Sequence, residues 1–245
     1  MNYYISDLHL FHRNVTMAGR NYDNRPFANV SEMGEKIREK WNKKVTRADT
    51  VYIVGDVAMH ASAETCIEYV GSLKGHKVLV KGNHDDLRDP MYRQLFEEIC
   101  DYKEVSDGFR GQNVKLVLCH YPILMWKHQH RGTILLYGHV HNSEEEVYFQ
   151  RCLAEMNATD YSGRRTGKSE LKAFNVGCMM PYMDYEPRSI WELLDMDRQR
   201  READAGTEEA KSAEDESAEV KGSEDESVEA ENAAPENAEA ENTEV

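Results

Sequence analysis

Residues 78–85 read Val78-Leu79-Val80-Lys81-Gly82-Asn83-His84-Asp85, and this stretch decides how the chain folds. Its first three residues are large and apolar, as in a strand that is buried on both faces of a sheet. Three polar side chains follow, directly after a glycine that permits a tight turn. Because α/β folds bind ligands outside the carboxyl ends of such strands, the stretch predicts both a central strand and a candidate site.

Four further polar motifs occupy the same kind of position, each directly after a short apolar run. They are Asp7-Leu8-His9, Gly55-Asp56, Cys119-His120 and Gly138-His139-Val140-His141. Each motif alone is most often a surface turn. Histidine, aspartate and asparagine seldom cluster at buried strand ends without a function, so the five motifs together predict one shared site.

Helical patterns separate the first apolar runs. Ser31 is expected to cap a helix, Ser62 opens a second one, and Asp89-Pro90 starts a third that continues through Leu95 and Ile99. Strand and helix therefore alternate over the first hundred residues, which favours a layered α/β domain.

The later apolar runs have few helical patterns between them. The runs at residues 102–106, 114–118, 134–138 and 171–176 predict a second, more antiparallel sheet stacked on the first, followed by a helix from Ser189 to about Arg198. Residues 142–170 are too mixed to assign from periodicity, and a lid in that segment stays an open possibility.

The acidity of the chain lies in its last part. Residues 202–245 hold 17 acidic side chains and two lysines, which accounts for the formal net charge of −15, whereas residues 1–201 hold 28 acidic and 28 basic side chains. A segment of this composition cannot bury enough apolar surface to offset its ordering entropy. We predict a folded domain over residues 1–198 and a disordered tail over residues 199–245, which either solubilises the protein or contacts a basic partner.

Composition also bears on the redox state of the cysteines, the location of the protein and its partners. The five cysteines are odd in number, widely spaced and without a Cys-x-x-Cys pair, which argues against a disulfide framework or a structural zinc site. No secretory signal pattern and no apolar stretch of membrane-spanning length occurs. We expect a cytoplasmic protein with reduced thiols and no membrane partner. A neutral domain also lacks the broad basic surface that duplex nucleic acid requires.

The residue types at the strand ends favour metal binding. Two neighbouring cations need about seven or eight nitrogen and oxygen ligands, one of them bridging, and the motifs supply that many. Imidazole and carboxylate together suit Mn, Fe, Zn or Ni. Cys119 precedes His120 and is expected to point to the opposite side of its strand, so no thiolate selects zinc.

In this order the five motifs resemble those of the calcineurin-like metallophosphoesterase superfamily. The resemblance implies an αββα sandwich, two stacked mixed sheets flanked by helices, with a dinuclear metal centre in which manganese is the first choice. Matching motif positions implies two ligand sets that share Asp56 as the bridge. They are Asp7, His9, Asp56 and His141 for one metal, and Asp56, Asn83, His120 and His139 for the other.

The resemblance implies hydrolysis of a phosphoester. Two cations would bind phosphoryl oxygens and acidify a bridging water, giving a hydroxide for in-line attack. His84 lies beside the ligand Asn83 and is not needed as a ligand, so we expect it to assist the leaving group. Asp85 either fixes the tautomer of His84 or caps a helix.

Two longer strings resemble a small bacterial branch of uncharacterised calcineurin-like phosphoesterases. They extend the first motif to Asn14 and add Asn24-Arg25-Pro26-Phe27. His12 and Asn14 follow the first motif closely enough to line the same cleft, and Arg25 could grip a phosphate with two hydrogen bonds. These three residues are the predicted substrate contacts. The segment from Trp126 to Arg131 either stacks a base or forms plain surface.

The second motif departs from the phosphoprotein phosphatases, which read Gly-Asp-x-x-Asp-Arg-Gly. Here Met59 stands in place of the second Asp, and the Arg that grips a phosphomonoester is missing. We therefore predict a phosphodiesterase that acts on nucleotide-type substrates. The alternatives are a phosphomonoesterase or pyrophosphohydrolase of small nucleotides and a noncatalytic scaffold, which the complete motifs disfavour. His60 either joins the site or is a surface histidine.

Overall fold

The computed structural model describes residues 1–17, 23–159 and 169–204. The chain divides into two units, Met1–Leu194 and Asp195–Val245. The acidic tail that was expected to be disordered lies, from residue 205 on, outside the described residues. Within the described ranges, no helix combines the length and the apolarity needed to cross a membrane.

The first sheet has the order β1-β2-β3-β4 and is parallel throughout. Its strands are β1 (Asn2–Ile5), β2 (Thr50–Ile53), β3 (His76–Val80) and β4 (Glu98–Cys100), and the helices α1 (Val30–Lys44) and α2 (Ala63–Ser72) connect the first three. A mixed sheet was expected here. Helical connections return each strand to the same edge of the sheet, which makes neighbouring strands parallel.

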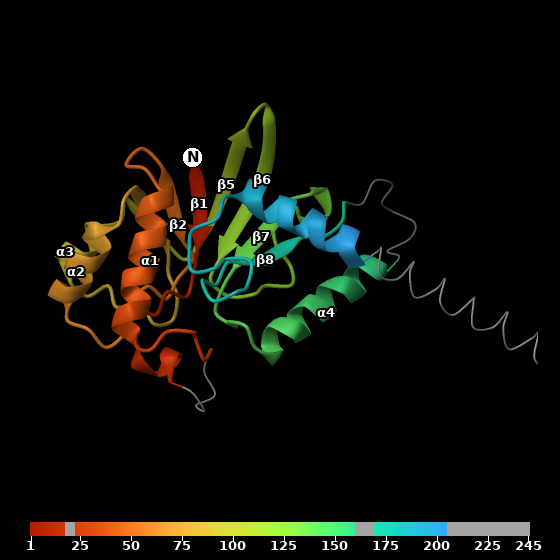
Figure 1. Cartoon of the computed structure of the whole chain (residues 1–245). Helices are drawn as coiled ribbons and strands as arrows, with labels where there is room; N and C mark the ends of the chain where they lie inside the picture. The colour runs from red at the N-terminus through yellow and green to blue at the C-terminus, as the bar shows by residue number, and fades with distance from the viewer. Residues whose placement is uncertain (18–22, 160–168, 205–245) are drawn as a thin grey trace, which may run out of the picture. The chain divides into compact units, whose positions relative to one another are not determined.

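The second sheet is mixed and has the order β5-β6-β7-β8. Its strands are β5 (Tyr102–Phe109), β6 (Gln112–Cys119), β7 (Ile134–Tyr137) and β8 (Ala173–Asn175). Only β5 and β6 pair in antiparallel fashion, through a tight hairpin that projects beyond the rest of the sheet in Figure 1. The second sheet was expected to be the more antiparallel of the two, and the β5–β6 pair makes it so, although β6 and β7, and β7 and β8, pair in parallel.

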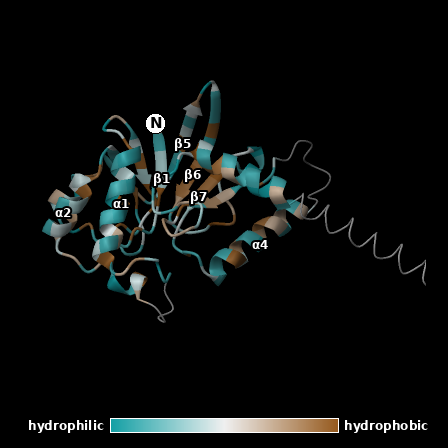
Figure 2. Ribbon diagram, viewed as in Figure 1, coloured by the Kyte–Doolittle hydropathy of each residue, from teal (hydrophilic) through white to brown (hydrophobic). Residues whose placement is uncertain are grey.

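The predicted αββα sandwich is confirmed. Alternate residues of β6 point to opposite sides: Leu116 and Leu118 join the large core cluster, whereas Val117 joins a second cluster with Phe149 and Leu153 of α4 (Glu144–Ala158). Figure 1 shows α1, α2 and α3 on one side of the sheets and α4 on the other. The apolar residues gather on the strands, and the outer faces of the helices are polar (Figure 2).

Two predicted helix limits were wrong for local reasons. Asn29 caps α1 in place of Ser31, because its side chain accepts hydrogen bonds from the backbone N–H groups of Ser31 and Glu32, each at 3.0 Å. The third helix, α3 (Pro90–Arg93), is a single turn capped by Asp89. It does not reach Ile99, which pairs with Leu79 of β3 in the edge strand β4.

The helix that was expected from Ser189 to about Arg198 is present and longer than expected. Helical residues run from 190 to 204, so the predicted domain boundary at residues 198 and 199 falls inside this run. Ser189 caps its start, and the Glu192 carboxylate accepts a hydrogen bond from the backbone N–H of Ser189 at 2.8 Å.

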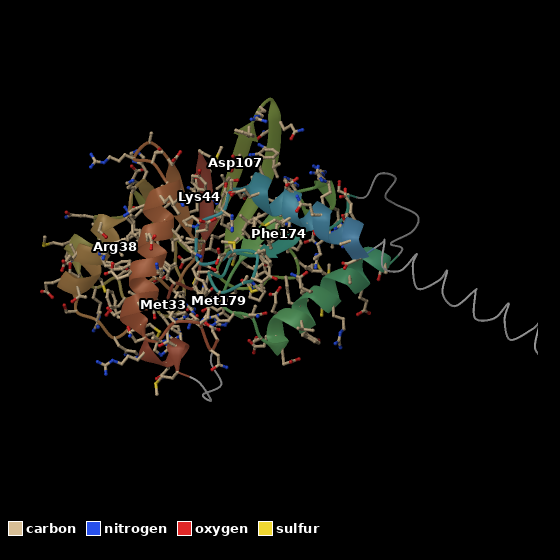
Figure 3. All side chains as sticks on the ribbon, viewed as in Figure 1. Met33, Arg38, Lys44, Asp107, Phe174 and Met179 are labelled. Carbon is tan, nitrogen blue, oxygen red and sulfur yellow. The ribbon has the colours of Figure 1, made fainter. Side chains whose placement is uncertain are left out.

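Buried polar contacts fix the two sheets against each other. The Tyr4 hydroxyl on β1 donates a 2.7 Å hydrogen bond to the carboxylate of Asp107 on β5, a residue labelled in Figure 3. Burial and this bond raise the pKa of Tyr4, so the phenol keeps its proton and stays a donor. Beyond β1, the backbone of Ser6 bonds to Val176 and Cys178, which follow β8. The carboxyl ends of β1 and β8 are thereby held together.

Candidate metal centre

All five motifs lie where strands end, and the ends of both sheets meet at one place. The first three motifs follow three adjacent parallel strands, and the other two follow a neighbouring pair in the second sheet. The side chains brought together are Asp7 and His9 after β1, Asp56 after β2, Asn83 after β3, His120 after β6, and His139 and His141 after β7.

One group of donor atoms forms around His141. Its Nε2 lies 3.0 Å from His9 Nε2 and 3.6 Å from Asp7 Oδ1. The three side chains each offer an atom within 4.8 Å of the others. Two imidazole nitrogens and a carboxylate oxygen that face one another are a suitable ligand set for a divalent cation.

A second group forms around Asn83. Its Oδ1 lies 3.1 Å from His120 Nε2 and 2.9 Å from His139 Nδ1. Asp56 Oδ2 lies 3.5 Å from His120 Nε2 and 3.6 Å from His9 Nε2, between the two groups. A carboxylate in that place is positioned to bridge two cations.

The backbone at five of these residues is left-handed, a conformation that side chains other than glycine rarely adopt. Each such residue costs on the order of 1–3 kcal/mol, and they concentrate at functional sites where the surroundings hold them in place. The residues and their φ angles are Asp7 at 53°, His9 at 45°, Asp56 at 56°, His139 at 72° and His141 at 51°.

The glycines of the motifs give the ligand side chains room. A Cβ atom on Gly82 would come within 3.0 Å of the Asp56 carboxylate, and one on Gly138 would meet the Asp7 carboxylate equally closely. A Cβ on Gly55 would overlap the His120 ring. The pairing of glycine with a polar residue in these motifs is therefore a packing requirement as well as a turn requirement.

Two carboxylates are buried at the centre, with Asp7 0% and Asp56 1% exposed. Asp7 accepts hydrogen bonds from the Ser6 hydroxyl and the His139 backbone N–H, and Asp56 accepts one from the His84 backbone N–H. Among the described residues, no lysine or arginine forms an ion pair with either carboxylate. Buried carboxylates are costly unless a positive charge faces them, so this donor set fits bound cations.

The imidazoles are prepared for ligation in different ways. Burial, with the neighbouring His141 in addition, lowers the pKa of His9, and burial lowers the pKa of His139. Both therefore favour the neutral form that binds metals. His120 donates its Nδ1–H to the Val54 carbonyl at 2.8 Å, which leaves the Nε2 lone pair directed at Asn83 and Asp56.

Asp23 belongs to the centre and was missed by the sequence analysis. Its Oδ1 accepts a 2.7 Å hydrogen bond from His141 Nδ1, which leaves Nε2 of that ring free to face His9 and Asp7. Burial opposes a charge on His141, but this bond and the two nearby carboxylates raise its pKa. The one feature of the sequence that could have pointed to Asp23 is its position two residues before Arg25.

Arg25, a predicted substrate contact, is buried, and its guanidinium is already bonded to groups of the protein. The residue is 2% exposed, and its guanidinium donates to the carbonyls of Asp7 and Leu8 at 2.8 Å and to Asp23 Oδ2 at 2.8 and 2.9 Å. These hydrogen bonds use the guanidinium N–H donors that a phosphate contact would need. Arg25 instead holds the left-handed loop after β1 and the carboxylate that orients His141.

Asp85 has neither of the roles expected for it. Its carboxylate accepts hydrogen bonds from the backbone N–H groups of Asp56, Val57 and Gly82, at 3.0, 2.9 and 2.8 Å. It caps no helix, since Asp89 caps α3. Asp85 ties the loop after β2 to the loop after β3, because a carboxylate has enough lone pairs for several N–H groups.

The remaining predicted contacts stay predictions. His84 is exposed, and its ring centre lies 5.5 Å from that of His9, outside both groups of donor atoms. His12 is buried, with its ring centre 5.7 Å from that of His9 and 5.3 Å from that of His60. Asn14 is half-buried in the 3-10 helix η1 (Arg13–Thr16).

Trp126 offers no surface for stacking a base. It is 6% exposed, packs in the second core cluster, and donates its Nε1–H to the Thr133 carbonyl at 2.8 Å. Cys119 packs against the same cluster, on the side of β6 away from His120, as expected. The candidate metal groups among the described residues contain no cysteine.

Comparison with known proteins gives the class. A family model for the calcineurin-like phosphoesterases matches residues 3–174, so this chain belongs to that family. Members of the family are metal-dependent phosphoester hydrolases that typically bind two divalent cations, and the protein is accordingly a metal-dependent phosphoesterase.

Two individual proteins and one solved structure are also similar to this chain. An uncharacterised protein of Methanocaldococcus jannaschii is 31% identical over 147 residues, which cover 60% of this chain and 72% of the relative. The gene 66 protein of a mycobacterium phage is 27% identical over 57% of this chain and 78% of its own length. A crystal structure of a protein of unknown function from Aquifex aeolicus superposes with a TM-score of 0.53 at 25% identity, covering 80% of this chain and 98% of that one.

Replacement of Asp85 should destabilise the protein. Asp85→Ala leaves three partly buried N–H groups without their acceptor, and each unsatisfied group costs about 1–3 kcal/mol when buried, so we expect a loss of at least about 2 kcal/mol in the free energy of unfolding. Urea denaturation monitored by tryptophan fluorescence measures it. The neighbouring Asp86→Ala, whose carboxylate pairs with Arg88 at the surface, should leave the midpoint nearly unchanged. Equal midpoints for both variants would contradict this role of Asp85.

Replacement of Asp23 should weaken metal binding. Asp23→Asn keeps the shape of the side chain but removes the charge that orients His141, and outer-shell losses of this kind typically lower metal affinity roughly 10–100-fold. Isothermal titration calorimetry with Mn²⁺ measures the affinity. Asp101→Asn, which removes an exposed carboxylate that pairs with Lys81, is the control. An unchanged affinity in Asp23→Asn would contradict the role assigned to Asp23.

Proposed function

We propose that this protein is a dinuclear-metal phosphodiesterase that acts on nucleotide-type substrates. The observation that carries the proposal is the convergence of imidazole, carboxylate and amide donors from both sheets, with Asp56 Oδ2 3.5 and 3.6 Å from nitrogens of the two groups. Seven side chains would serve as ligands. One cation would be held by Asp7, His9, Asp56 and His141, and the other by Asp56, Asn83, His120 and His139.

Manganese stays the first choice for both cations, as the family resemblance implies, and the donor set is compatible with it. Nitrogen and oxygen donors of intermediate hardness suit Mn, Fe, Zn or Ni, and soft thiolates that would favour zinc are missing from the candidate groups of the described residues. When bound, such cations would neutralise phosphoryl charge and acidify water.

His84 would act on the leaving group. Its backbone N–H bonds to Asp56 Oδ1 at 2.9 Å, which anchors the residue at the edge of the centre, while its exposed ring stays outside the donor groups. A ring in this position can give a proton to the departing alkoxide, or stabilise it by hydrogen bonding, without giving up a metal ligand.

The surroundings of Met59 support a phosphodiester substrate. Met59 Sδ lies 3.2 Å from His9 Nδ1, so a neutral thioether stands where the phosphoprotein phosphatases carry a carboxylate. The arginine that follows that carboxylate in those enzymes is also missing from this loop. Because a phosphomonoester carries one more negative charge than a diester, a site without that arginine favours the diester.

Paired variants should separate a bridging ligand from a residue that acts on the substrate. Asp56→Asn is expected to release metal from both positions and abolish turnover. His84→Asn should keep metal content near wild type while lowering turnover by roughly 100-fold, the scale of losing a general acid. Metal analysis of the purified variants, together with turnover assays, measures both effects. Equal metal loss in the two variants would show that His84 is itself a ligand.

Two chromogenic substrates should distinguish the ester classes. The Mn²⁺-loaded protein is expected to turn over bis-p-nitrophenyl phosphate with a higher kcat/KM than p-nitrophenyl phosphate. A preference for the monoester would favour a phosphomonoesterase. If neither substrate nor any member of a nucleotide panel is hydrolysed by metal-loaded protein, a noncatalytic scaffold becomes the better interpretation.

A further inference from the structure

A cavity of about 620 Å³ opens beside His84. Two segments line it, residues 58–66, which lead from β2 into α2, and residues 84–92, which lead from β3 into α3. The volume lies within the range of about 300–1,000 Å³ that is usual for small-molecule sites. None of the seven proposed ligands lines it.

The cavity begins where the proposed leaving group would depart. His84 lines its wall, and so does Met59, whose sulfur lies 3.2 Å from His9 Nδ1. A phosphoryl group at the metal centre would therefore have His84 and the cavity on the same side. An alkoxide that takes a proton from His84 has to stand next to that ring, so the rest of the leaving alcohol reaches into the cavity.

The lining is mixed, with apolar side chains from both segments beside five ionisable ones. Ala58, Ala61 and Ala63 contribute small side chains from the first segment, and Pro90 and the ring of Tyr92 come from the second. His60 and His84 supply hydrogen-bonding groups near the entrance to the metal centre. A flat, partly apolar group with a few hydroxyls, such as a nucleoside, matches this lining.

The charged side chains of the cavity do not favour a second phosphate. Asp86 and Asp89 oppose the single cation Arg88, so the lining has a formal charge of −1 with imidazoles counted as neutral. The Arg88 guanidinium is already paired, with its Nε 2.8 and 3.0 Å from the two carboxylate oxygens of Asp86. Asp89 uses its carboxylate to cap α3. A further anionic group would meet a paired cation and an additional negative charge.

We infer that this cavity receives the leaving group of the substrate and selects an uncharged alcohol of nucleoside size over one that carries further phosphate. The inference rests on the proposed phosphodiesterase function. In the reaction a water oxygen bonds to phosphorus, the bond from phosphorus to the nucleoside oxygen breaks, and that oxygen takes the proton from His84. A proton of the attacking water restores His84, and the products are a phosphomonoester and a nucleoside.

The choice of bond tests the inference with the unmodified protein. The substrate is a diester that joins methanol and the primary hydroxyl of thymidine to one phosphate, so hydrolysis can release either alcohol. We expect thymidine and methyl phosphate as the main products, identified by liquid chromatography. Predominant release of methanol and thymidine monophosphate would place the nucleoside outside the leaving-group cavity and overturn the inference.

A filled cavity gives a second measurement that needs no turnover. Ala61→Trp places a large side chain in the cavity and should weaken the binding of free thymidine, measured by isothermal titration calorimetry, about tenfold or more. Ala61→Ser, which adds a single oxygen atom, is the matched control and should bind as the wild type does. Thymidine binding that is equal in wild type and Ala61→Trp would contradict the inference.

The charge of the leaving group gives the third comparison. A second phosphate on the thymidine of the same diester should lower kcat/KM at least about tenfold, because it adds a negative group to a negative lining. A faster reaction of the charged diester would overturn the selectivity. If no diester is hydrolysed at all, the proposed function fails, while loss of thymidine binding in Ala61→Trp would still identify the cavity as a nucleoside site.

Discussion

The structure is organised around the burial of two carboxylates, Asp7 and Asp56, at the point where the two sheets meet. Burying these charges is unfavourable by itself, and backbone N–H groups, a serine hydroxyl and bound cations are what can offset it. The parallel order of β1, β2 and β3 brings the loops to one edge, and the left-handed residues turn their side chains inward. Asp85 and Arg25 then hold those loops by hydrogen bonds to backbone groups, which leaves the side chains of the proposed ligands free to face a cation.

The side chains that the sequence singled out as metal ligands lie together in the structure, because each motif directly follows its strand. For these central strands the apolar run and the glycine beside it are local signals, so both can be read from the sequence alone. Asp23 could not be found in this way, because its partner His141 lies 118 residues further along the chain. Strand β4 was missed for a similar reason. Residues 98–100 looked helical from the sequence alone, but their pairing with β3, which lies earlier in the chain, makes them a strand.

The substrate contacts were harder to predict, because burial is a property of the whole fold. Arg25 carries the right group for a phosphate, yet packing against the loop after β1 removes it from solvent. Trp126 stands in a basic, aromatic stretch, yet its ring completes the core cluster under α4. In both cases the residue type suits the predicted contact, and only the tertiary packing shows that the side chain is already engaged within the protein.

The edge strand β4 also shapes the space beside His84. Its pairing with β3 begins at Glu98, and the segment between Asp89 and that strand contains the single helical turn of α3. Pro90 and Tyr92 of that turn line the cavity opposite the small side chains that precede α2. The metal centre and the cavity are thus built by different parts of the fold. The positions of the proposed ligands depend on the central strands, whereas the shape of the cavity depends on the loops at the edge of the sheet. Changes in those loops could alter which leaving group is accepted while the metal centre stays intact.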